Sequence, residues 1–329
     1  MSTTLPPFVI VRERDLDSLV DHALGTVDAL GWPRTPVLIL HAAAATLISS
    51  IMGKAWALEL QSKTPNFIRR PNDKEHDSTI AWISKLWRLA DTLYAVHRLE
   101  HVSDRLERLR GPNLEGTVAE LAAIERLHVW SPVWLRPESL GGYDADVMLD
   151  DGTMCALEVK CRLEETENTS SGVLSRLRKA RRQLPDDRPS LVWVRYAGQP
   201  VGRFQGPTMR GVGVAAVIET AVQEFLRNTR TVSAVMLSAE RPLLGYPEQR
   251  DFLIGGTGEW YVNEAAHPSD AFRRLVERQQ RFRVQDSILR APVLRACHRF
   301  GIPVENDDLP KQGPDEFRAE RAGGWRTFG

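Results

Sequence analysis

Four charged residues stand in two short runs of the chain that are otherwise mostly apolar and are separated by a tight turn. They are Asp144, Asp146, Glu158 and Lys160. Side chains alternate between the two faces of a strand, so the two aspartates share a face, as do Glu158 and Lys160. Carboxylate oxygens are the ligands that hard divalent cations such as Mg²⁺ prefer. A lysine beside them can orient a water molecule or balance charge on a phosphate, so the pattern indicates metal-assisted phosphodiester hydrolysis.

The turn 150–152, Asp-Asp-Gly, decides whether these acids meet. Aspartate tolerates turn geometry, and Gly152 supplies a positive φ without steric cost. A three-residue loop places Asp144 opposite Glu158 and gathers the acids on one face, with an almost wholly apolar face behind them. A two-residue turn would put Asp146 and Glu158 on opposite faces. The apolar purity of the second face favours the three-residue loop.

The elements that position these acids follow a readable order. The pattern predicts a helix over 114–128, a strand over 129–135, the two strands of the acidic hairpin, a helix over 172–184 and a strand over 191–196. This order, helix, three strands, helix, strand, indicates an α/β fold with a mixed sheet and helices packed on it.

We expect three regions along the chain. Residues 1–110 form a helical region, with long helices over 35–61 and 78–109. Residues 111–200 form the core. Residues 201–329 continue the α/β alternation and complete or cover the core, with a mobile tail from about residue 310. In the helix over 78–109, His97 and His101 would share one face, the spacing of paired metal ligands, although an exposed or partner-facing pair is the commoner meaning.

Composition sets limits on function. The chain has 329 residues, 42% hydrophobic and 26% charged, with a formal net charge of zero. The chain therefore has no overall positive charge that would attract nucleic acid, which would have to bind a local basic patch instead. Three cysteines do not make a disulfide framework, and no signal peptide is evident, so we expect a cytoplasmic protein. The apolar stretch 37–53 is short for a membrane span and predicts a buried helix, with no membrane partner.

The order of elements, with an Asp followed by Glu-x-Lys, resembles the signature of the PD-(D/E)xK nuclease superfamily and its restriction-endonuclease-like fold. Here the first acid is Asp146, eleven residues follow, and Glu158-Val159-Lys160 lies inside an apolar strand. No proline precedes the first acid, so Asp144 shares the candidate role. The resemblance covers about 85 residues, 113–197.

The resemblance implies roles for these residues. Asp146 and Glu158, with Asp144, would bind Mg²⁺ or Mn²⁺, and Lys160 would be catalytic. A further glutamate on the preceding helix often completes the site in the family. Glu120, beside the apolar stripe of the helix over 114–128, fits that role, and Glu115 is the alternative.

A basic helix follows the acidic hairpin and supplies candidate DNA contacts. They are Arg176, Arg178, Lys179, Arg182 and Gln183. Such a charge run is usually a solvated face, and the nearby acids of 163–167 are alternative partners. Next to an acidic metal site, such a charge run favours a role in DNA binding, because a phosphate backbone needs cations to balance its charge.

We therefore expect a divalent-metal-dependent nuclease that hydrolyses DNA in restriction, repair or defence against foreign DNA. We expect the helical region 1–110 to bind DNA, a protein partner or a second copy of the chain. The alternative is a non-catalytic DNA-binding or assembly module with the same fold. A third hypothesis is a helical scaffold in which Lys160 forms a structural ion pair with Asp144 or Glu158.

Overall fold

The structure is a computed structural model of the whole chain. It describes residues 15–34, 36–57, 86, 88–128, 131–162, 170–196, 213–244, 252–263, 265–266, 269–280 and 326–328. The chain divides into two compact units. The first comprises Met1–Pro112, Pro242–Ile254 and Arg283–Pro310, and the second comprises Asn113–Arg241, Gly255–Phe282 and Lys311–Gly329.

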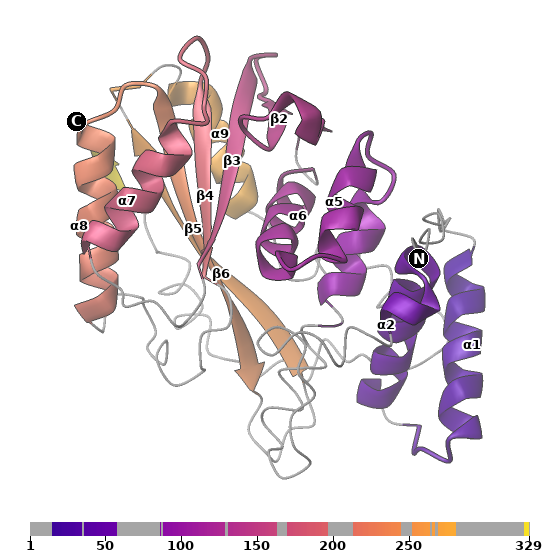
Figure 1. Cartoon of the computed structure of the whole chain (residues 1–329). Helices are drawn as coiled ribbons and strands as arrows, with labels where there is room; N and C mark the ends of the chain where they lie inside the picture. Colours follow the sequence, from indigo (N-terminus) through magenta and orange to yellow (C-terminus); the bar gives the residue numbers. More distant parts are fainter. Residues whose placement is uncertain are drawn as a thin grey trace. The chain divides into compact units, whose positions relative to one another are not determined.

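The first unit contains helices α1 (Asp15–Ala29), α2 (Pro36–Met52) and α5 (Val102–Leu109). Helices α1 and α2 are neighbours in space as well as in sequence (Figure 1). Many α2 side chains are buried, which confirms a buried apolar helix within the expected 35–61. The helix ends before Gly53, whose φ of +91° does not continue a right-handed helix. Within the described residues, no helix is long and apolar enough to cross a membrane.

The expected single helix over 78–109 is wrong in its last third. Residues 97–101 form turns, and His101 has a φ of +61°, so α5 starts afresh at Val102. His97 is buried, with Nδ1 at 2.8 Å from the carbonyl oxygen of Tyr94, whereas His101 is exposed. The break removes the shared face on which a histidine pair would depend.

The second unit contains the sheet. Its elements are α6 (Leu114–His128), β1 (Val133–Leu135), a 3₁₀ turn (Glu138–Leu140), β2 (Ala145–Met148), β3 (Met154–Arg162), α7 (Ser170–Arg181), β4 (Ser190–Tyr196), α8 (Gly213–Arg227), β5 (Val232–Leu244), β6 (Phe252–Asn263), α9 (Ser269–Gln280) and β7 (Arg326–Phe328). The described strands form one sheet in the order β1 to β7. β1, β2 and β3 are antiparallel, while β4 and β5 run parallel to β3. The prediction of an α/β fold with a mixed sheet is confirmed.

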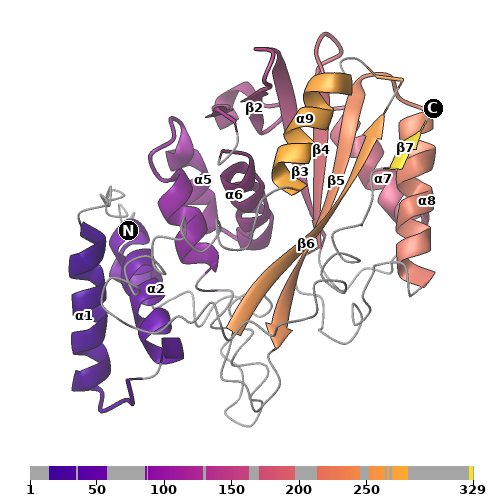
Figure 2. The ribbon, with the colours of Figure 1, turned by 180° about the vertical axis from the view of Figure 1, so that it is seen from behind.

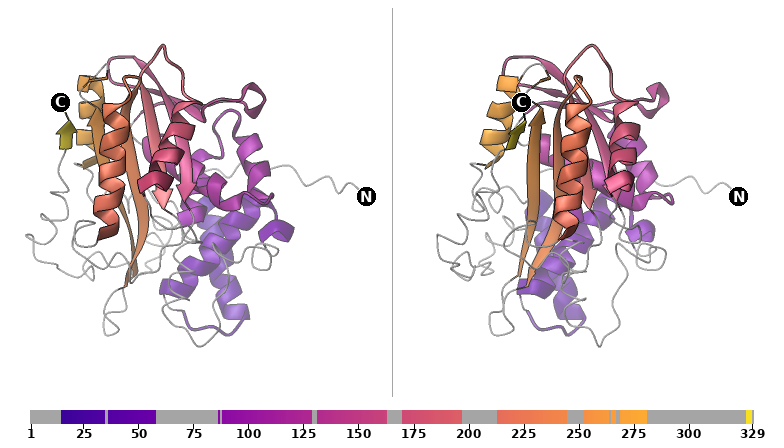
Figure 3. Two further views of the ribbon diagram at one scale, coloured as in Figure 1. Left: turned by 60° about the vertical axis from the view of Figure 1, so that its left-hand side comes forward. Right: turned by 90° about the vertical axis from the view of Figure 1, so that its left-hand side faces the viewer.

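Helices cover both faces of this sheet. α7 and α8 lie side by side on one face (Figures 1 and 3), and α9 lies on the other (Figure 2). The core beneath α7 and α8 contains the even-numbered side chains Ala156, Val192 and Val194. On the opposite face, the buried Arg195 donates a hydrogen bond of 3.0 Å to the carbonyl of Val118 in α6. The sheet therefore has α6 on one side and α7 on the other.

The turn between β2 and β3 is the three-residue loop that the sequence favours. The Leu149 N–H donates to the Thr153 carbonyl at 2.8 Å, and Gly152 has a φ of +83°. The register pairs Ala145 with Leu157 and Asp146 with Ala156. Continued by one residue, it places Asp144 opposite Glu158, as predicted.

Replacing Gly152 with alanine should destabilise the protein by about 1 kcal/mol, because a side chain there must adopt a left-handed conformation. No atom lies within 4 Å of the added Cβ, so the cost is conformational and not steric. Gly25→Ala is the matched control, because Gly25 lies inside α1 with equal space around it. It should stabilise its helix by up to about 1 kcal/mol. Urea unfolding with the same sign for both variants would contradict this interpretation of the turn.

The expected tail from about residue 310 lies outside the described residues, except for β7. Strand β1 is shorter than expected: residues 129 and 130 lie outside the described part, and Ser131 and Pro132 precede the first paired residue. Helix α7 begins at Ser170 and ends at Arg181, so Arg182 and Gln183 follow the helix instead of belonging to it.

Candidate functional site

Asp144 lies beside the Glu-x-Lys segment of β3, in the second unit. It lies one residue before β2, and its backbone N–H donates to the Leu157 carbonyl at 2.9 Å. Its Oδ2 accepts a hydrogen bond of 2.7 Å from the Val159 N–H. These two bonds fall on either side of Glu158 in β3. The edge of the hairpin therefore holds the Asp144 carboxylate at the backbone of the Glu-x-Lys segment.

Two buried carboxylates act on Asp144. Glu120 from α6 is 2% exposed, and Glu158 from β3 is 1% exposed. Burial, followed by the negative charges of Glu120 and Glu158, raises the pKa of Asp144 well above its usual range. The hydrogen bond from Val159 and the ammonium of Lys160 oppose this rise only in part. Asp144 therefore binds a proton more readily than an ordinary aspartate, because burial and the two neighbouring carboxylates disfavour its charged form.

The structure also separates the two candidates on α6. Glu120 faces the interior and interacts electrostatically with Asp144. Glu115, in the first turn of α6, is only half-buried and is not among the groups that shift the pKa of Asp144. The apolar stripe beside Glu120 in the sequence is the buried side of the helix, which is why this glutamate enters the interior.

Lys160 is held from two sides. Its ammonium forms an ion pair with Glu158 and donates to the Gln183 side-chain oxygen at 2.7 Å. The Gln183 amide nitrogen in turn donates to the Gly142 carbonyl at 3.2 Å. Gln183 was predicted as a DNA contact, but it is placed as a bridge between Lys160 and the turn before Asp144. The third strand and the segment after α7 thus fix the lysine together.

Asp146 is placed differently from the other acids. Its Oδ1 accepts a hydrogen bond of 2.9 Å from the Tyr143 hydroxyl and lies 3.4 Å from Nη1 of Arg188. Arg136 donates to the same hydroxyl at 3.0 Å, and its guanidinium lies over the Tyr143 ring at 4.2 Å. Asp146 therefore belongs to a neighbouring network with compensating positive charge. Of the two aspartates, it is Asp144 that lies beside Glu158 and interacts electrostatically with Glu120.

This network contains residues that sequence reasoning missed. Tyr143, Arg136 and Arg188 come from three separate segments, before β2, after β1 and before β4. The sequence contains only a weak signal for these contacts, because an arginine outside a motif gives no indication of its partner. Only the position of Tyr143 next to Asp144 hinted at proximity.

The basic residues predicted to bind DNA do not all share one environment. Arg178, Lys179 and Arg182 are exposed, while Arg176 is half-buried. The exposed Arg178 lies 3.6 Å from Glu224 of α8. The acids of 163–167, considered as alternative partners, lie outside the described residues. Three of the predicted contacts thus remain accessible to a ligand.

The donor set of the cluster fits a hard divalent cation. Glu120, Asp144 and Glu158 offer carboxylate oxygens only, and burial, followed by repulsion from the two glutamates, raises the pKa of Asp144. As they stand in the described part of the chain, no three His, Cys, Asp or Glu side chains converge closely enough to hold an ion together. Lys160 is bound to Glu158, so coordination by all three acids would require side-chain rotation. The chemistry of the site fits a metal, and its present geometry is that of an ion-paired site.

Asp144→Asn should stabilise the protein in the presence of EDTA at neutral pH. The raised pKa means that the folded state binds a proton more tightly than the unfolded state. The stability that Asp144 contributes is therefore complete below the ordinary carboxyl pKa of about 3.8 and is lost as pH rises through the folded-state value. Asparagine removes this loss and can still accept the Val159 N–H.

The melting temperature, measured with EDTA, should thus differ little between variant and wild type in acid and increasingly favour the variant as pH rises. Asp146→Asn is the control, because it removes a carboxylate from the network with Arg188 and Tyr143. A melting-temperature difference for Asp144→Asn that does not change with pH would contradict this electrostatic origin.

Comparison with known proteins finds no matching family model, no matching curated protein and no matching solved structure.

Proposed function

We propose that the second unit is a divalent-metal-dependent nuclease that hydrolyses DNA phosphodiester bonds. The observation that carries the proposal is that Glu120 of α6 and Glu158 of β3 both act electrostatically on Asp144, which directly precedes β2, beside a lysine that is itself held in place. A purely structural ion pair would need one acid for one lysine. Here two further carboxylates, those of Glu120 and Glu158, add to the effect of burial in raising the pKa of Asp144.

The fold supports the same proposal. A helix precedes three antiparallel strands, a second helix follows, and the next strand runs parallel to the third. This is the order expected of a restriction-endonuclease-like core, and we propose that the region belongs to that class. Analogy of fold alone does not fix an activity, so the weight rests on the acids.

The chain's own residues would have distinct tasks. Glu120, Asp144 and Glu158 would hold Mg²⁺ or Mn²⁺, which when bound supplies Lewis acidity toward water and phosphate. Lys160, steadied by Gln183, places a positive charge next to the acids, where it can stabilise charge that develops on the phosphate. The exposed Arg178, Lys179 and Arg182 would balance the charge of the DNA backbone.

The test is cleavage of plasmid, linear duplex and single-stranded DNA in Mg²⁺ or Mn²⁺. We expect at least one form to be cut by the wild type and not by Glu158→Gln, which preserves the shape of a buried side chain. Equal melting temperatures, within a few degrees, would show that the variant folds. Cleavage that survives Glu158→Gln would refute the assignment of the site.

A non-catalytic DNA-binding or assembly module is the second candidate function. It is favoured by the existing ion pair between Lys160 and Glu158, which partly neutralises the site without an ion. Salt-dependent DNA binding with no cleavage of any DNA form would support this candidate over the nuclease.

A further inference from the structure

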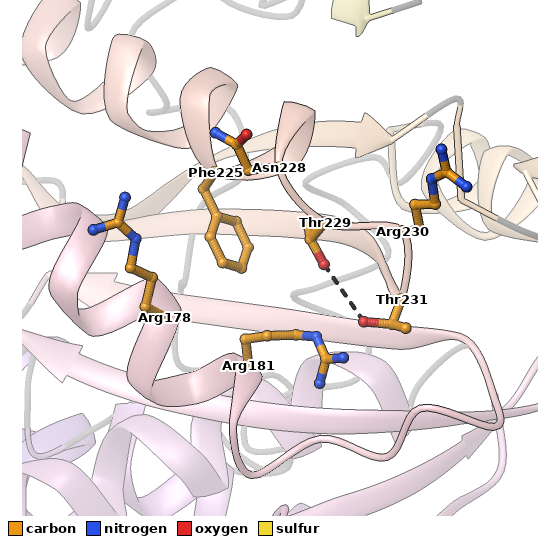
Figure 4. A pocket seen from close by; sticks show the side chains of 7 residues that line it. All are labelled: Arg178, Arg181, Phe225, Asn228, Thr229, Arg230 and Thr231. Atoms are coloured by element: carbon orange, nitrogen blue, oxygen red, sulfur yellow. Dashed lines mark hydrogen bonds between the residues drawn. The ribbon is translucent and has the colours of Figure 1, made fainter.

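A pocket of about 260 Å³ opens where α7 and α8 end and β5 begins (Figure 4). It lies in the second unit and contains none of the acids described above. Its lining residues are Arg178, Arg181, Phe225, Asn228, Thr229, Arg230 and Thr231. The lining therefore contains three cations and no anion. The predicted DNA contacts include only the first of these residues.

The side chains have different places in the pocket. The Phe225 ring points inward, and the Thr229 and Thr231 hydroxyls face each other at 3.4 Å (Figure 4). Arg178 and Arg230 lie on opposite sides of the group of residues drawn, and Arg181 lies at the end of α7, below Phe225 in this view (Figure 4). Phe225 is only 5% exposed and supplies an apolar, low-dielectric wall. Such a wall strengthens the field of the charges beside it.

The ends of two helices would normally repel an anion, because the carboxyl end of a helix carries partial negative charge. Here several of the carbonyl oxygens at these helix ends already accept hydrogen bonds. The Asn263 side chain donates to the carbonyls of Leu226, Thr229 and Val232 at 3.2, 2.8 and 3.0 Å. At the end of α7, the carbonyls of Ala180 and Arg181 accept hydrogen bonds from the backbone N–H groups of Gln183 and Leu184 at 3.0 and 3.3 Å. These bonds use acceptors at the ends of both helices, and the lining offers guanidinium and hydroxyl donors.

Two acids at the rim compete with a ligand only weakly. Glu224 lies 3.6 Å from Arg178, and both side chains are about half exposed, at 47% and 64%. Asp186, which pairs with Arg181, is 78% exposed. Exposed ion pairs contribute little free energy, about 0–1 kcal/mol, so a multiply charged oxyanion can displace them. No acidic partner of Arg230 is found among the described residues.

We propose that this pocket is a binding site for a phosphate group. Several guanidinium groups and hydroxyls around one hollow suit a tetrahedral dianion that accepts hydrogen bonds on all sides. The volume is below the range of about 300–1,000 Å³ typical of cofactor sites, so a single phosphate with part of its ester fits better than a whole cofactor. The phosphate would come from a free nucleotide or from a nucleic-acid strand. The site does not depend on DNA cleavage.

Binding should be measured with the full chain in EDTA, so that cleavage plays no part. The probes are inorganic phosphate, a nucleoside monophosphate, and one short oligonucleotide with and without a 5′-phosphate, all compared with chloride at equal ionic strength. Arg230→Gln should weaken phosphate binding by about tenfold, the loss of one charge-assisted hydrogen bond. Arg227→Gln is the matched control, since this exposed residue ends α8 but does not line the pocket. Thr231→Val tests the hydroxyl without a change of charge.

Weaker binding by Arg230→Gln and Thr231→Val, with Arg227→Gln like the wild type, would establish the site. Preference for free phosphate and the mononucleotide would identify a nucleotide ligand. Preference for the 5′-phosphorylated strand would identify nucleic acid. Equal losses for Arg230→Gln and Arg227→Gln, or phosphate binding no tighter than chloride binding, would overturn the proposal.

Discussion

Asp144→Asn should reduce DNA cleavage by about a thousandfold, comparable with the removal of a group that stabilises a transition state directly. Asp146→Asn should cost about tenfold or less. The two changes are chemically identical and lie two residues apart, but the carboxylates occupy different environments. Asp144 faces the charges of Glu120 and Glu158, whereas Asp146 is bonded to Tyr143 and Arg188.

The two variants are matched controls for each other, because each loses one negative charge and keeps nearly the same side-chain shape. Initial cleavage rates on one DNA substrate, with saturating Mn²⁺ and equal amounts of folded protein, give the two ratios. Loss of activity in Asp146→Asn together with an active Asp144→Asn would reverse the assignment. It would restore Asp146 as the first acid, as the spacing of the motif suggests.

Lys160→Met should destabilise the protein by about 3 kcal/mol at neutral pH. The substitution leaves the Glu158 carboxylate, 1% exposed, without its ion-pair partner and next to Asp144. Breaking a buried ion pair from one side typically costs about 3–5 kcal/mol. The lower end applies here because the Lys160 side chain is 22% exposed. Urea unfolding at neutral pH measures the effect.

Adding Glu158→Gln to Lys160→Met should restore most of the lost stability, since the double variant no longer buries a Glu158 carboxylate without the Lys160 ammonium. The destabilisation of Lys160→Met alone should also shrink in acid, where Glu158 can bind a proton. A double variant as unstable as the sum of the two single variants would show that the pair does not interact. That result would refute the claim that Glu158 holds the Lys160 ammonium in place.

The sequence predicted the local chemistry of the hairpin well. The Asp-Asp-Gly turn has one favourable geometry that keeps the apolar side chains together, and Gly152 adopts it. The register between Asp144 and Glu158 follows from that loop and from strand periodicity alone. Helix α6 was predicted with both ends correct, because its apolar stripe and its flanking residues agree.

Other features depend on contacts that no local pattern reveals. The different environments of Asp144 and Asp146 depend on Arg188, which lies more than forty residues further along the chain and contacts Asp146. Gln183 meets Lys160 because α7 ends at Arg181 and the chain turns back toward the hairpin. The break at His101 lies inside a pattern that remains helical on both sides. Tertiary packing determines each of these three features, and the periodicity of the sequence contains no information about it.

The most direct measurement of the central claim is Mn²⁺ binding to the full chain, followed by electron paramagnetic resonance of the free ion. The account predicts that the wild type and Asp146→Asn bind Mn²⁺, and that Asp144→Asn and Glu158→Gln bind it at least about tenfold more weakly. Equal Mn²⁺ affinity in the wild type and Asp144→Asn, or no binding by the wild type, would contradict a metal centre at Glu120, Asp144 and Glu158.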